Sequence, residues 1–183
     1  MKNILFLLLA TFIISCNYTD LNFKIEKGVV GRINIETKIE QLDSIFSNDS
    51  IVKRIGEGDY VFSSSDKYLI FDKKKNHLLT IMPKQQHDPE ETIETVQIFS
   101  KNFKTAKGIN IESSFIDISK NHKISNIQNT INNVIVFVDE IDAYFIIDKK
   151  NMDFKFQNET EKKIEIKDIP PKSKVKRFMI GWN

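Results

Sequence analysis

The feature that most constrains the fold of this chain is a pair of internal matches at one spacing. The segment INIET at 33–37 returns as INIES at 109–113, and YLIFDKK at 68–74 returns as YFIIDKK at 144–150. Both pairs are 76 residues apart. Drift in a chain rich in Ile, Lys and Asn is the alternative explanation, but drift rarely preserves spacing. The matches therefore predict two copies of one structural unit.

Each copy is predicted to begin with a short helix. In the first copy Thr37 occupies an N-cap position and Glu40 follows three residues later, which is the spacing of a capping box. Apolar residues then recur at helical spacing, at Ile39, Leu42, Ile45 and Phe46. In the second copy Ser113 takes the cap, and one face carries Phe115, Ile118 and His122. Helices of about ten residues depend on tertiary packing, so we expect both to pack on a sheet.

About four strands are predicted after each helix. In the first copy they are expected at 59–62, 67–72, 77–82 and 92–99. In the second copy they are expected at 134–139, 143–148, 154–157 and 174–182. The polar segments KKKN at 73–76 and KKNMD at 149–153 are interpreted as matching hairpin turns. Such short connections favour antiparallel pairing.

The order of these elements over 28–183 resembles the architecture of the beta-lactamase-inhibitor proteins and of their BamE-like single-unit relatives. It is also similar to uncharacterised lipoproteins of Bacteroidota-type genomes. The resemblance implies a fold that binds other proteins, although the disulfides of the known inhibitors have no counterpart in a chain with one cysteine. The predicted class is α+β: a tandem repeat of a short helix followed by about four antiparallel strands, with units at 28–107 and 108–183.

The N-terminus has the pattern of an export signal. An apolar run from Ile4 to Ile14, interrupted by Thr11, is too short to cross a bilayer but has the length of a signal-peptide core. The sequence IISC that ends at Cys16 resembles the lipobox of bacterial lipoproteins. This resemblance implies cleavage before Cys16 and acylation of its thiol. A plain signal peptide with an incidental cysteine is the alternative.

We therefore expect a cleaved signal peptide at 1–15, a lipidated tether at 16–27 and lipid attachment at Cys16. Acyl chains would hold the mature protein on the membrane without a spanning segment. Asn17 follows the cysteine; enterobacterial lipoproteins kept in the inner membrane carry Asp there, so the resemblance favours the outer membrane. The formal net charge of +2 provides no field for nucleic acid, and no nucleic-acid partner is expected.

The sequence offers little for metal, cofactor or nucleotide chemistry. The only histidines, His77, His87 and His122, are scattered rather than set at metal-ligand spacing, so we expect no metal and no cofactor. The segment IGEGDYVF at 55–62 resembles a kinase glycine loop but lacks the lysine and aspartate segments that such a site needs. The segment SSSD at 63–66 lacks the glycines of a nucleophile elbow.

Two further features bear on function. Asp139, Glu140 and Asp142 cluster where a glycan hydrolase would need paired carboxylates, but they also fit an ordinary turn between two strands. Trp182 follows Gly181 at the end of the last predicted strand. It is a candidate interaction residue because tryptophan is enriched at binding hot spots, unless it packs on the sheet instead.

Together these features predict a lipid-anchored cell-envelope protein that binds another protein and has no catalytic residues. An inhibitor, an immunity protein or an assembly accessory would fit this prediction. Two alternatives stay open. One is a carrier of a small ligand or lipid, with an apolar cavity between sheet and helices. The other is an envelope glycan hydrolase that uses Asp139, Glu140 or Asp142.

Overall fold

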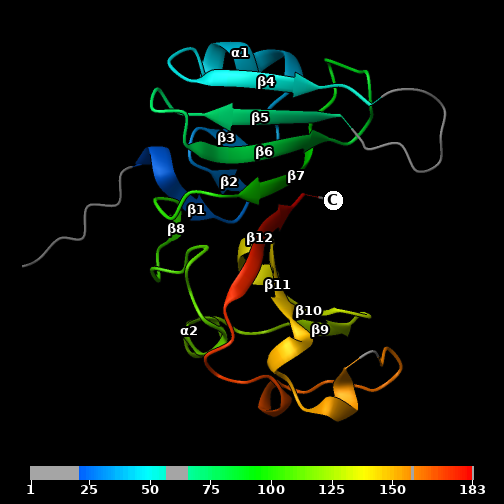
Figure 1. Cartoon of the computed structure of the whole chain (residues 1–183). Coiled ribbons are helices and arrows are strands. Elements are labelled where there is room, and N and C mark those ends of the chain that lie inside the picture. The colour runs from blue at the N-terminus through cyan, green and yellow to red at the C-terminus, as the bar shows by residue number, and fades with distance from the viewer. Residues whose placement is uncertain (1–20, 57–65, 158, 183) are drawn as a thin grey trace, which may run out of the picture.

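The computed structural model describes residues 21–56, 66–157 and 159–182, and Figure 1 shows their arrangement. Cys16, the strand predicted at 59–62 and the serines at 63–65 lie outside the described residues. None of the helices in the described part of the chain has both the length and the hydropathy needed to span a membrane.

The centre of the molecule is an eight-stranded sheet in which every neighbouring pair is antiparallel. From one edge to the other its strands are β4 (Ser50–Arg54), β5 (Lys67–Phe71), β6 (His77–Pro83), β7 (Ile93–Ile98), β12 (Val175–Gly181), β11 (Ala143–Asp148), β10 (Asn133–Val138) and β9 (Asn126–Asn129). We call β4–β7 the first half and β9–β12 the second half. Counted inward from either edge, the strands of each half follow one another in chain order.

A smaller sheet lies behind the first half in Figure 1. Its order is β3 (Ile33–Asn34), β2 (Val29–Val30), β1 (Lys24–Glu26) and β8 (Lys104–Thr105), and only the β1–β8 pair is parallel. A short 3-10 helix, η1 (Leu21–Phe23), precedes β1. The tether predicted over 16–27 therefore reaches too far along the chain, because 21–26 are part of the fold.

The helical segments are short. A 3-10 turn η2 (Ile39–Gln41) continues into α1 (Leu42–Ile45), and α2 covers Phe115–Asn121. Four further 3-10 turns are η3 (Asp139–Ile141), η4 (Lys149–Asn151), η5 (Phe154–Phe156) and η6 (Ile166–Asp168). The predicted α+β class is confirmed at this level, with strands predominating over helices.

Both predicted helix caps are displaced by one residue. The first helical segment is capped at Lys38, whose N–H donates to the side chain of Gln41 at 2.9 Å. Thr37 instead accepts the N–H of Asn34. The second is capped at Ser114, whose N–H and hydroxyl both donate to Asp117. The capping chemistry was predicted correctly, but another acceptor three residues ahead satisfies it at each site.

The two matched sequence pairs do not keep the same relation in space. The spacing of 76 residues relates 39–45 to α2 and relates β4 to β9. The YLIFDKK segment, however, begins in β5, the second strand of its half, whereas YFIIDKK lies in β11, the third strand of the other half. The connection from β4 to β5 is longer than that from β9 to β10, and β11–β12 is longer than β6–β7. The prediction of an ungapped match is therefore wrong.

Two predictions in the second half are also wrong. Residues 154–157 form the 3-10 turn η5 rather than a strand, and 149–153 do not close a hairpin. These residues belong instead to a long connection that runs from β11 to β12 and contains η4, η5 and η6. By contrast, 73–76 do form the predicted hairpin turn between β5 and β6.

One continuous core lies on a single face of the large sheet. Strand residues at alternate positions supply it, and the helical segments contribute Leu42, Phe115 and Ile118. The rings of Phe145 and Phe178 stack at its centre, with centroids 4.5 Å apart. Because the core joins both halves, the described chain buries its apolar surface as one unit.

Candidate functional site

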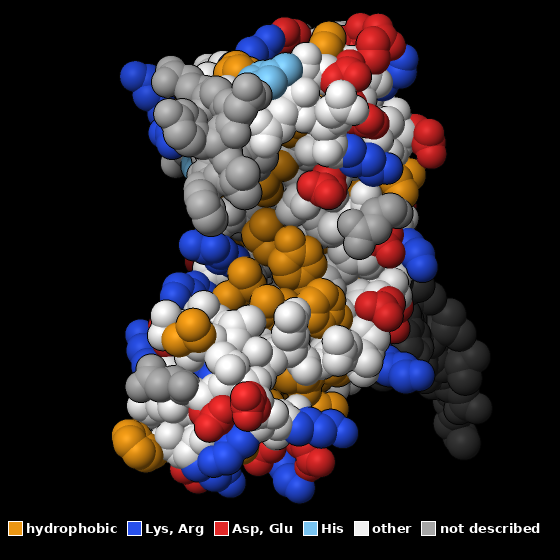
Figure 2. Space-filling model, turned by 90° about the vertical axis from the view of Figure 1, so that its right-hand side faces the viewer, with side chains coloured by type: hydrophobic (Ala, Val, Ile, Leu, Met, Phe, Trp, Pro, Cys, Tyr) orange, Lys and Arg blue, Asp and Glu red, His pale blue; other side chains and the backbone are white. Residues whose placement is uncertain are grey.

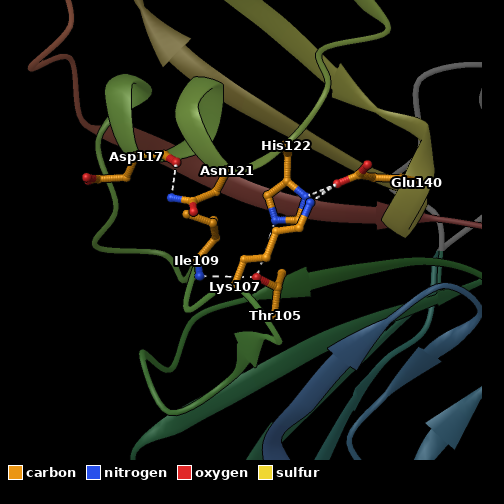
Figure 3. Close-up of polar contacts among 7 residues, drawn as sticks. All are labelled: Thr105, Lys107, Ile109, Asp117, Asn121, His122 and Glu140. Atoms are coloured by element: carbon orange, nitrogen blue, oxygen red, sulfur yellow. Dashed lines mark hydrogen bonds and ion pairs between the residues drawn. The ribbon is translucent and has the colours of Figure 1, made fainter.

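The most elaborate polar cluster surrounds His122, directly after α2. Its Nδ1 contacts the carboxylate of Glu140 in η3, and the ammonium of Lys107 reaches the same carboxylate at 3.0 Å (Figure 3). Because a carboxylate can only accept, we assign the ring proton to Nδ1. The Nε2 of His122 then accepts from the hydroxyl of Thr105 at 3.4 Å. Lys107 and His122 together lower the pKa of Glu140.

Hydroxyl, imidazole and carboxylate in this order resemble the relay that activates a nucleophile. The surroundings do not suit that chemistry. Thr105 is 2% exposed and His122 is 6% exposed, so a substrate has no access to either reacting atom. The hydroxyl of Thr105 also accepts the N–H of Ile109 at 3.1 Å. The cluster therefore fastens α2 and η3 to the β8 segment. His122 was predicted to cap helix carbonyls, but its side chain bonds to Glu140.

The three acids proposed for a hydrolase lie in the predicted turn, between β10 and β11. Asp139 accepts the hydroxyl of Ser125 at 2.6 Å. Asp142, in the left-handed conformation with φ 51°, accepts the N–H of Gly28 at 3.0 Å. Since Glu140 is held by His122 and Lys107, the acids face three different partners. This arrangement does not form the pair of carboxylates that glycoside cleavage requires.

The remaining histidines hold no metal site. The N–H of His87 donates to the buried carboxylate of Asp66, at 2.7 Å. The ring of His77 is stacked between Phe71 and Phe99, at centroid distances of 4.7 and 3.8 Å, and burial lowers its pKa. Within residues 21–56, 66–157 and 159–182, no group of three or more His, Cys, Asp or Glu side chains is arranged to bind a metal ion.

Trp182, the candidate interaction residue, is not presented on the surface. Its side chain is 1% exposed and belongs to the core. Its backbone N–H donates to the carbonyl of Glu94 beside β7, at 2.7 Å. The hot-spot interpretation is therefore wrong for this residue, because the ring packs on the sheet and fastens the last strand to the first half.

The face of the large sheet opposite the core carries a different set of apolar side chains. Val136, Val138, Phe145 and Ile147 have no exposed surface, so the alternating residues of β10 and β11 point to the opposite face. These partly exposed residues are Ile135, Phe137, Tyr144 and Ile146. We call this side of the sheet the open face.

The register places one apolar row across the open face. The residues paired in succession are Leu69, Thr80, Gln97, Met179, Tyr144 and Phe137. Phe137 and Tyr144 stack with their ring centroids 5.7 Å apart. Tyr144 lies over Gly181, where an added Cβ would be 3.3 Å from its ring. Figure 2 shows hydrophobic side chains gathered at the narrow middle of the molecule.

Basic residues border this apolar row. Arg54 and Lys67 stand directly opposite each other on β4 and β5, and Arg177 is paired with Ile146 on the neighbouring strand. None of the three has an acidic partner within 4.0 Å among the residues that the structure describes. Like charges placed opposite each other destabilise a sheet, so their juxtaposition has no structural benefit here.

Comparison with known proteins extends only to the fold. No protein-family model matches the sequence, and neither does any curated protein. Among solved structures, the crystal structure of the uncharacterised protein YfeY from Escherichia coli is similar, with a TM-score of 0.51 and 14% sequence identity. The match covers 87% of this chain and 99% of that chain. At this identity the likeness concerns architecture alone.

Proposed function

We propose that this protein is a non-catalytic binding module of the cell envelope and that its open face contacts another protein. The observation that supports this proposal is the apolar row of Met179, Tyr144 and Phe137 on a sheet face that no described element covers. Contiguous apolar surface with a charged border is characteristic of an interaction site. Because the border is basic, at Arg54, Lys67 and Arg177, the partner is expected to be acidic around its contact surface.

We further propose that the chain is a tandem repeat with units at 28–107 and 108–183. Each unit would consist of a short helical segment followed by four strands. The inward strand order of the two halves supports this proposal, as does the spacing of 76 residues that relates 39–45 to α2. The open face would then form where the last strands of the two units, β7 and β12, meet.

The same proposal includes a lipid anchor at Cys16 after removal of 1–15, with the outer membrane as the destination. The IISC sequence supports it. Incorporation of labelled palmitate in the native host tests the anchor. We expect label on the wild-type protein and none on Cys16→Ala. Wild-type protein without label, together with a Cys16→Ala variant that still fractionates with membranes, would contradict the anchor.

Binding by the open face is tested with a photo-crosslinking amino acid placed at Phe137 or at Tyr144 of the full-length protein in its host. Both positions are expected to crosslink to the same protein, identified by mass spectrometry. Phe154 provides the control position, because its side chain is 84% exposed but lies outside the open face. Equal crosslinking from Phe154, or none from either open-face position, would contradict the proposal.

A matched pair of substitutions sharpens this test. Ile135→Lys places a charge on the open face, whereas Ile131→Lys places the same charge in the exposed turn between β9 and β10. We expect Ile135→Lys to reduce crosslinking from Phe137 at least tenfold and Ile131→Lys to leave it unchanged. The thermal unfolding temperature of each variant is measured alongside, so that loss of folding is distinguished from loss of contact.

The structure favours neither alternative function. The acids of the hydrolase hypothesis are engaged with Ser125, His122 and Gly28. The space between the sheet and the helical segments, where a carrier would hold its ligand, is filled by buried side chains that include Leu42, Phe115 and Ile118.

A further inference from the structure

The chain enters the described fold at η1, and several contacts fix this entry in place. The ring of Phe23 packs edge-on against Phe103, with centroids 5.1 Å apart. Gly31, at φ +56°, lies directly under the backbone of Asn22, where an added Cβ would be 2.3 Å from the carbonyl oxygen. These contacts set the side of the molecule on which the preceding residues join it.

A run of three lysines lies beside this entry. Lys73, Lys74 and Lys75 form the exposed turn between β5 and β6, which we call the lysine turn. Lys73 and Lys74 border the same surface depression as Asn22 and Phe23, with a volume of about 640 Å³. Figure 1 shows η1 and the end of the β5–β6 hairpin on the same side of the molecule.

The charges of the lysine turn are not compensated nearby. None of its lysines has an acidic partner within 4.0 Å in the described part of the chain. Asp72 accepts the N–H groups of Lys74 and Asn76, each at 2.8 Å, and the Asn76 side chain, and these bonds lower its pKa. Asp49, the other acid beside the depression, is paired with Arg32.

We propose that the lysine turn is a second membrane contact, which binds the anionic head groups of the bilayer that holds the acylated Cys16. This inference rests on the proposed lipid anchor. Six residue steps separate Cys16 from Asn22, which is about 20 Å when fully extended. The lysine turn is therefore kept near the lipid surface. Each lysine close to an anionic leaflet strengthens binding about fivefold, so three are enough to orient the domain.

The test uses the mature lipoprotein, purified from host membranes and reconstituted in vesicles. Since the chain has a single cysteine, which the anchor occupies, an introduced cysteine is the only free thiol. A fluorophore is attached to Lys74→Cys or to Lys167→Cys, an exposed lysine on η6, and vesicles carry lipid with a nitroxide head group as quencher. Vesicles of phosphatidylcholine are compared with vesicles that also contain phosphatidylglycerol.

We expect quenching at position 74 to rise when phosphatidylglycerol is present and to fall again at high salt, with little change at position 167. Lys73→Gln together with Lys75→Gln, made in the Lys74→Cys protein, is expected to weaken docking about 25-fold. The control pair Lys162→Gln and Lys163→Gln is expected to leave it unchanged.

The mass of the N-terminal peptide reports acylation independently of quenching. Acylated protein that is quenched equally at 74 and 167 overturns the inference and leaves the anchor intact. Protein without acyl groups overturns both. Quenching at 74 that is independent of phosphatidylglycerol and of salt overturns the electrostatic contact, because nearness to the bilayer alone would then explain it.

Discussion

The two halves of the large sheet fasten their irregular connections with buried side chains of opposite charge. In the first half the carboxylate of Asp66, 1% exposed, accepts the N–H groups of Gly56 and His87 at 2.8 and 2.7 Å. In the second half the ammonium of Lys149, 2% exposed, donates to the carbonyls of Thr130 and Glu159 at 2.7 and 2.6 Å.

The comparison shows how the same need is met by different chemistry. Backbone outside helices and strands has N–H and C=O groups that require partners when they are buried. An acid supplies acceptors where N–H groups converge, and a lysine supplies donors where carbonyls converge. The burial of Lys149 lowers its pKa, because its charge is removed from water. Neither residue can be exchanged for the other without leaving several backbone groups unpaired.

The largest effect is expected from breaking the junction between the halves. Phe178→Ala removes a fully buried ring from β12 that stacks on Phe145. We expect the free energy of unfolding to fall by about 3–5 kcal/mol. Urea unfolding followed by far-UV circular dichroism and by Trp182 fluorescence measures the loss.

Ile81→Ala in β6 is the matched change in the first half, with an expected loss of about 2–5 kcal/mol. Because one core joins the halves, both probes should shift together even though Trp182 follows β12. A circular dichroism transition that moves while the fluorescence transition stays would show that the halves unfold separately.

Replacing the buried lysine tests the second half alone. Lys149→Met keeps the length of the side chain and removes its hydrogen bonds to Thr130 and Glu159. Bonds from a charged donor are worth more than neutral ones, so we expect a loss of about 2–3 kcal/mol in unfolding free energy. Lys150→Met, at the exposed neighbouring position, should change it by less than about 0.5 kcal/mol. Equal losses would mean that the buried contacts are not responsible.

The corresponding change in the first half is smaller. Asp66→Asn preserves shape and one acceptor oxygen but removes the negative charge that strengthens the bonds from Gly56 and His87. We expect a loss of about 1–2 kcal/mol in urea unfolding. Asp43→Asn, an exposed acid on α1, serves as the control. A loss at Asp66 no larger than that at Asp43 would remove the proposed parallel with Lys149.

The smallest effect concerns pH and the cluster around His122. The Lys107 and His122 contacts lower the pKa of Glu140 below its ordinary 4.5. A carboxyl with a lowered pKa in the folded state stabilises the protein above its unfolded pKa and loses that stabilisation as pH falls through the folded value. We therefore expect Glu140→Gln to reduce the fall in stability below pH 4.5. Identical pH profiles of unfolding for wild type and variant would contradict this.

Strands with strong alternation or dense apolar content were predictable from sequence. The predicted strands at 67–72, 77–82, 92–99 and 143–148 all form within one residue of their predicted limits. The strand β9 was missed because NIQN offers a single apolar residue. Strands β1, β2, β3 and β8 have only two or three residues each, and such short segments show no period.

The candidate site was harder to predict. The burial of Trp182 depends on the pairing of β12 with β7, which joins residues more than 75 positions apart. The open face could not be recognised because alternating apolar residues in β10 and β11 look like a strand buried on both faces. The contact between His122 and Glu140 likewise depends on how α2 and η3 pack, which no local pattern encodes.

The position of β12 also has a consequence for biosynthesis. This strand completes the centre of the large sheet, yet it is the last strand of the chain described. Until the ribosome has released residue 181, β7 and β11 each present a bare edge that can pair with a strand of another molecule. The nascent chain therefore stays incomplete until the end of translation, and premature termination before β12 should yield products that aggregate instead of smaller folded domains.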